Sequence, residues 1–166
     1  MKSSVYAAIP LFLLLAIGQT AVLPYFTLFG TVVQLPLLIV ISWTLLRGVE
    51  EGLLWAFVAG LSIDLFSIGP LGATALAYIT AVLALSALIS LLPSSQFFLP
   101  IIYAVLGTLV YLIIYTIFIT ILGYGTTTGT ITSYTTLILL NAGFMLPVFW
   151  LITRIDRALR PQRVEV

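Results

Sequence analysis

The chain has 166 residues, of which 62% are hydrophobic and 7% are charged. A soluble domain carries roughly 25% charged residues, so this composition excludes a soluble globular protein and predicts an integral membrane protein. The absence of Cys and His excludes disulfides and removes the usual proton shuttle, and the net charge of +1 gives no signal for nucleic acid binding.

Apolar runs separated by Gly, Pro and charged residues predict an all-α bundle of six transmembrane helices forming a single domain. The predicted spans cover residues 5–23, 32–46, 52–66, 71–92, 97–122 and 132–153, and a basic cytoplasmic tail follows at 154–166. The first run, preceded by Lys2, also has the pattern of a cleaved signal peptide. Because this run is long enough to cross a bilayer, we favour a retained helix.

The third run contains the one charged residue that lies deep inside an apolar stretch, Asp64. Counting back in steps of four gives Gly60, Ala56 and Gly52, which share one face of a helix with it. Small residues at this spacing let another helix approach closely in lipid. A carboxylate at mid-membrane costs about 2.5 to 3.5 kcal/mol, so it usually points into a bundle. We therefore expect this face to meet protein and not lipid.

Two roles are open for the Asp64 carboxylate. A lone acidic residue in the membrane can serve as a proton or cation site of a transporter. The structural alternative, which we favour, is a hydrogen bond to a backbone amide, to Asn141 or to a threonine such as Thr74.

The fourth run has a tight-packing face of its own. Ala73, Ala77 and Ala81 are four residues apart and share one face of the predicted helix. Pro70 is expected near the first turn of this helix, where its missing amide is tolerated. Since the third run is short for a 30 Å core, we expect the Gly69–Pro70 turn to dip below the membrane surface and to be shielded by protein.

The ingredients of catalysis are missing from the sequence. There is one carboxylate at depth where an intramembrane aspartyl protease needs two, and no histidine for a nucleophile and base pair. No phosphate loop or cluster of metal ligands is present either. We therefore predict no catalytic, cofactor-binding or metal-binding residues, and a protein that is not an enzyme.

The basic residues predict the orientation in the membrane. With six spans, all of them fall on the side that holds both termini, which is the cytoplasm by the positive-inside rule. The predicted topology anchors are Lys2, Arg47, Arg154, Arg157 and Arg160, to which Arg163 adds a sixth basic residue. Asp156 and Arg160 are also spaced to pair along the last helix.

A set of short motifs occurs in fixed order through the second to fourth runs. They are Arg47-Gly48, Glu51-Gly52, Gly60-Leu61, Asp64-Leu65, Pro70-Leu71-Gly72 and Ala75-Leu76. This set resembles the signature of the MreD family of rod shape-determining membrane proteins, and the likeness in length, spans and basic C-terminal end extends over most of the chain. The resemblance implies a non-catalytic scaffold of the peptidoglycan elongation machinery in the cell membrane, without a cofactor. It also implies a hetero-oligomer that binds MreC and through it affects MreB, RodA and the transpeptidase of RodA.

A different function remains open, because the MreD family resembles in fold the substrate-binding subunits of energy-coupling-factor vitamin transporters. Those subunits dock their transport partner through alanines spaced by four on the first helix. Here Ala7, Ala8 and Ala16 are followed four residues later by Leu11, Phe12 and Thr20. Since that pattern is missing, we favour the scaffold over the vitamin-binding subunit.

Overall fold

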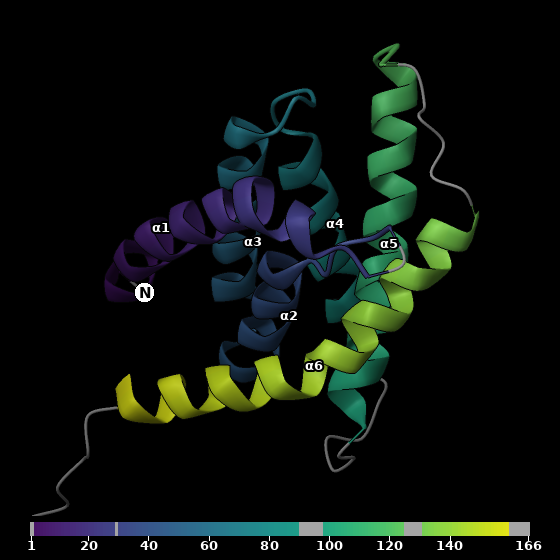
Figure 1. Ribbon diagram of the computed structural model, residues 1–166. Helices are drawn as coiled ribbons and strands as arrows, with labels where there is room; N and C mark the ends of the chain where they lie inside the picture. The colour runs from purple at the N-terminus through teal and green to yellow at the C-terminus, as the bar shows by residue number, and fades with distance from the viewer. Residues whose placement is uncertain (1, 29, 90–97, 125–130, 160–166) are drawn as a thin grey trace, which may run out of the picture.

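The computed structural model describes residues 2–28, 30–89, 98–124 and 131–159, and it is all-α in these residues (Figure 1). Apart from one isolated bridge between Leu28 and Thr31, the described chain contains no β-structure. The α-helices are α1 (Lys2–Ile17), α2 (Leu35–Arg47), α3 (Val49–Phe66), α4 (Ala73–Ile89), α5 (Leu99–Ile121) and α6 (Ile131–Leu159). The predicted helical membrane bundle is confirmed. The ends of the fourth and fifth predicted spans at 90–92 and 97, and the tail from residue 160, lie outside the described residues.

Local sequence explains how α2 and α3 meet. Pro36 lies in the first turn of α2, where no amide is needed, and Gly48 ends this helix with a φ of 92°. The same glycine precedes α3, whose first turn holds Glu50 and Glu51. Negative charge at this end is favoured by the exposed amides of the helix. The result is a one-residue corner between two antiparallel neighbours.

The first predicted span is less regular than expected. After α1 the chain continues as a short π-helix, η1 (Gly18–Val22), and then as a short 3₁₀-helix, η2 (Leu23–Phe26). The Gln19 side chain donates to the carbonyl oxygen of Val33 over 2.9 Å, which ties this turn to the approach of α2. A single sequence gives no periodic signal for such a change of helix type.

Helix α2 lies at the centre of the bundle, since it contacts every other α-helix and is buried from Pro36 to Thr44. Helix α3 packs against α1, α2 and α4, while α5 packs against α4 and α6, and α6 returns to α2. Phe12 of α1 meets Trp55 of α3 edge to face, with ring centroids 5.4 Å apart. Helix α6 changes direction along its length (Figure 1), and Pro147 lies inside it. Proline in a helix interior is a usual cause of such a bend, because it removes a backbone hydrogen bond.

Three described helical segments are long and apolar enough to cross a membrane: Ala8–Phe26, Leu99–Ile121 and Thr132–Ala158. Leu35–Arg47 and Ala73–Leu88 are apolar but shorter. Helix α3, with 18 residues, reaches about 27 Å at 1.5 Å per residue. These lengths and compositions are those of a helical membrane protein.

Candidate functional site

Asp64 lies in the last turn of α3 with only 3% of its surface exposed, and its carboxylate caps the start of α4. The oxygens accept hydrogen bonds from the backbone amides of Gly72 at 2.9 Å, Thr74 at 3.1 Å and Ala75 at 3.3 Å. Amides in a first helical turn have no partner inside their own helix, and the helix dipole favours negative charge there. The carboxylate therefore compensates for its own burial by satisfying the exposed end of the next helix.

The Asp64 carboxylate thus accepts from backbone amides, one of the kinds of partner expected for it, whereas Asn141 forms its hydrogen bonds elsewhere. The Asn141 side chain of α6 accepts a hydrogen bond from the backbone N–H of Gln34 and donates one to the Thr108 hydroxyl of α5, each over 3.0 Å. These contacts form a separate, largely buried polar link that joins Gln34, the residue just before α2, to α5 and α6. In membrane interiors such interhelical hydrogen bonds hold helices together.

The cap depends on a very close approach of α3 and α4 at Gly60. A Cβ atom placed on Gly60 would lie 2.3 Å from the Cα atom of Ala75, which is far inside any normal contact. Gly72, just before α4, has a φ of 92°, which side chains other than hydrogen rarely allow. This glycine also explains why α4 begins at Ala73 and not near Pro70 as expected, since a residue with this φ cannot continue a helix.

The small-residue face of α3 is buried along its whole length. At one end a Cβ on Gly52 would lie 2.2 Å from the Thr44 hydroxyl of α2, and at the other end Gly60 meets α4. Ala56, between them, has no exposed surface. The remaining small residues named from the sequence, Ala73, Ala77 and Ala81, are also buried, while Pro70 is half-buried in the turn before α4.

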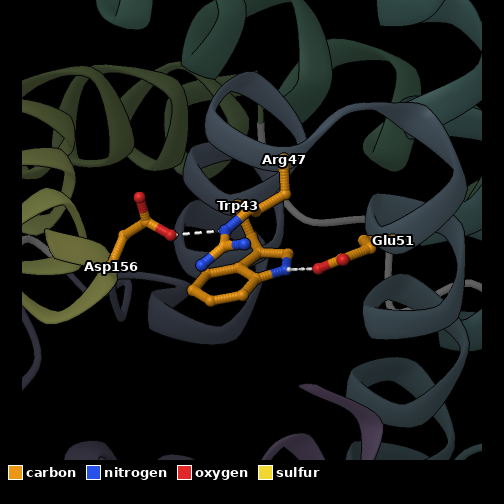
Figure 2. Close-up of polar contacts among 4 residues, drawn as sticks. All are labelled: Trp43, Arg47, Glu51 and Asp156. Carbon is orange, nitrogen blue, oxygen red and sulfur yellow. Dashed lines mark hydrogen bonds and ion pairs between the residues drawn. The ribbon is translucent and has the colours of Figure 1, made fainter. Parts of the chain in front are cut away.

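A second cluster of charged and aromatic residues joins α2, α3 and α6 at the other end of α3 (Figure 2). Arg47, in the last turn of α2, forms an ion pair with Asp156 of α6, and the side chain of Asp156 is only 3% exposed. The Arg47 guanidinium lies 5.5 Å from the centre of the Trp43 ring. The Trp43 indole donates to the Glu51 carboxylate over 3.0 Å and stacks on Trp55 at 3.9 Å.

The sequence alone did not indicate this cluster. The four-residue spacing of Asp156 and Arg160 predicts a local pair along the last helix. Arg160 lies outside the described residues. Arg47 and Asp156 are 109 positions apart, so no periodic pattern connects them. The usable signal was the topology, because six spans place both residues on the same side of the membrane.

The predicted topology anchors do not gather in one place. Arg47 belongs to the cluster of Figure 2, whereas Arg154 and Arg157 are exposed on α6. The Arg154 guanidinium lies 4.8 Å from the centre of the Trp150 ring. Lys2 begins α1. Among the described residues, no group of three or more His, Cys, Asp or Glu could hold a metal ion.

The Arg47–Asp156 pair should show strong energetic coupling. Arg47→Gln and Asp156→Asn are each expected to lower the free energy of unfolding by about 1–3 kcal/mol, because each removes one side of an ion pair in a largely buried site. The double variant should lose clearly less than the sum of the two. Thermal unfolding in detergent measures all three, with exposed Arg157→Gln as the control that stays within about 0.5 kcal/mol of the unchanged protein. Additive losses would show that the two side chains do not stabilise one another.

The family model described as rod shape-determining protein MreD matches residues 1–155 of the chain. The matched region includes the Asp64 cap and the residues of α2 and α3 that belong to the second cluster. It ends one residue before Asp156. No curated protein and no solved structure matches the chain.

Proposed function

Because the chain belongs to the rod shape-determining protein MreD family, its role lies in rod shape determination, and we propose that it acts there as a non-catalytic membrane scaffold. In this proposal it binds MreC directly as a hetero-oligomer, and through MreC it affects MreB, RodA and the transpeptidase of RodA during peptidoglycan synthesis. The observation that carries the scaffold role is the Asp64 cap. The carboxylate most suited to chemistry in the membrane already accepts the amides of three residues.

Three further polar contacts of the described chain support the same role. The Arg47–Asp156 pair, the Trp43–Glu51 hydrogen bond and the links of Asn141 each join different helices. These contacts hold the helices in one arrangement. A rigid bundle presents a fixed lipid-facing surface, which is what a partner with a single membrane helix needs for close packing.

We also propose the cell membrane as the location and six spans as the topology, with both termini in the cytoplasm. The Arg47–Asp156 pair supports this topology, since it brings the corner between α2 and α3 to the C-terminal part of α6. An even number of crossings separates these two points when α3, α4, α5 and α6 all span. The shorter helices α2 and α4 are accommodated in part by their packing against longer neighbours and in part by local thinning of the bilayer. The turn at Gly69–Pro70 is covered only on the side that faces α5, where the Tyr115 hydroxyl comes within 3.2 Å of a Cβ placed on Gly69. The neighbouring side chains of Ile68 and Leu71 are exposed.

Affinity purification from native membranes in mild detergent tests the scaffold proposal. We expect an MreC-like protein with one membrane helix to be recovered with the tagged chain and identified by mass spectrometry. A tagged membrane protein of unrelated fold gives the background, and Gly143→Ala, a change at an open position on α6, should retain the partner. The proposal is contradicted if no such partner is enriched and the purified chain instead carries a vitamin bound at submicromolar affinity.

A further inference from the structure

The C-terminal part of α6 runs in a different direction from the rest of the bundle. Helix α6 has 29 residues, or about 44 Å at 1.5 Å per residue, which exceeds a hydrocarbon core of about 30 Å. A straight helix of this length would extend into water. Instead, the part that follows the bend, drawn in yellow in Figure 1, crosses the end of α2 and does not continue beside α5. This segment, residues 148–159, is called the crossing segment below.

One face of the crossing segment is fixed to the bundle. Ile152 is 4% exposed and Asp156, one helical turn later, is paired with Arg47 at the end of α2. Asp156 is the one acidic residue among the described residues of α6. Because its side chain is buried and paired with Arg47, its carboxylate is not exposed on the outer surface.

The outer surface of the crossing segment combines a basic stripe with an apolar stripe. Trp150, Arg154 and Arg157 are exposed and are spaced by four and three residues, so they share one face. Leu151 and Ile155 are 53% and 42% exposed and form the neighbouring face. A helix with a basic face beside an apolar face is typical of segments that lie in the plane of a membrane surface.

We propose that the crossing segment lies in the headgroup region of the bilayer and binds anionic lipid there. Leu151 and Ile155 enter the boundary of the acyl chains, while Arg154 and Arg157 contact anionic headgroups and Trp150 lies at the level between them. The positive charge of Arg154 and Arg157, beside which the described part of α6 has no exposed carboxylate, is what selects an anionic lipid. This role goes beyond the scaffold proposal and does not depend on MreC. It uses the proposed topology only to place the segment on the cytoplasmic leaflet.

The depth of the segment can be measured because the chain has no cysteine. Leu151→Cys provides a single site for a nitroxide label in the full chain, reconstituted in nanodiscs of phosphatidylcholine with and without phosphatidylglycerol. The depth of the label is measured by comparing its accessibility to oxygen with its accessibility to a soluble nickel chelate. In the anionic discs we expect the label about 5–10 Å below the phosphates. Ile113→Cys on the exposed face of α5 is the control, and its depth should not depend on lipid charge. Adding Arg154→Gln and Arg157→Gln to Leu151→Cys should bring the label at 151 towards water.

Lipid selectivity can be measured through Trp150, since Trp43 and Trp55 are buried. Brominated phosphatidylglycerol should quench its fluorescence with roughly tenfold preference over brominated phosphatidylcholine, and Trp150→Phe gives the background. In the variant that carries both Arg154→Gln and Arg157→Gln, the ratio of quenching by the two brominated lipids should fall towards one. Equal quenching by both lipids overturns the proposal, as does a label at 151 that stays in water in anionic discs. A label protected only when a protein partner is added also overturns it, and assigns the surface to that partner.

Discussion

Gly60→Ala is expected to disrupt the contact between α3 and α4 and to reduce sharply the amount of folded protein in membranes. The added Cβ would lie 2.3 Å from the Cα and 2.5 Å from the amide nitrogen of Ala75. Overpacking a core typically costs 1–3 kcal/mol when side chains can move, and here the obstacle is backbone, so we expect a loss of about 3 kcal/mol or more. Membrane yield and thermal unfolding in detergent measure the effect, and Gly60→Leu should be at least as severe.

Gly143→Ala is the matched control for this prediction. Gly143 also lies inside a helix, but nothing is within 4 Å of a Cβ placed on it. Alanine is favoured over glycine in a helix interior by roughly 0.5–1 kcal/mol, so this variant should be as stable as the unchanged chain or slightly more so. If Gly60→Ala and Gly60→Leu leave both yield and partner binding unchanged, the close approach of α3 and α4 is not what holds the bundle together.

Asp64→Ala is expected to have the second large effect. It removes the acceptor for the amides of Gly72, Thr74 and Ala75, and Thr74 and Ala75 are themselves buried. Loss of a helix cap costs about 0.5–2 kcal/mol, and leaving buried donors unpaired adds about 1–3 kcal/mol. We therefore expect a loss of about 2–4 kcal/mol in the free energy of unfolding, measured by thermal unfolding in detergent.

Asp64→Asn separates the charge from the hydrogen bonds. One carboxylate oxygen, Oδ2, accepts from all three amides, while Oδ1 accepts only from Thr74. An asparagine that places its single carbonyl oxygen at the Oδ2 position can keep all three contacts. We therefore expect near-normal assembly for this variant. A loss of ion-driven uptake in vesicles carrying Asp64→Asn would instead identify the carboxylate as a transport site.

The sequence predicted the elements whose signals are local. Apolar length and helix-breaking residues indicated the helices, and the four-residue spacing from Gly52 to Asp64 identified a face that is buried in the structure. The cost of a charge in lipid was enough to favour a hydrogen-bonded Asp64 over a lipid-exposed one.

The features that the sequence did not predict depend on contacts between distant segments. The choice of Gly72, Thr74 and Ala75 as partners of Asp64 follows from the path of the turn, which is set by the positive φ of Gly72. The Arg47–Asp156 pair required knowledge of which helix ends meet, and so did the direction of α6 after its bend, which brings Asp156 to Arg47. No spacing within one helix carries this information.

Together these contacts tie α3 to its neighbours at both ends. Glu51, in the first turn, meets Trp43 of α2, and Asp64, in the last turn, caps α4. The two side chains are about 20 Å apart along the helix at 1.5 Å per residue. A helix held in this way cannot slide or rotate without breaking one of the contacts, which suits the proposed scaffold role.

Hydrogen exchange at the start of α4, resolved to single residues by fragmentation in the mass spectrometer, tests the central claim most directly. The amides of Gly72, Thr74 and Ala75 should exchange slowly in the unchanged chain and in Asp64→Asn. In Asp64→Ala they should exchange at least tenfold faster, while the middle of α5 keeps its protection. Equal exchange at these three amides with aspartate and with alanine at position 64 would contradict the account, because the carboxylate would then not be what holds them.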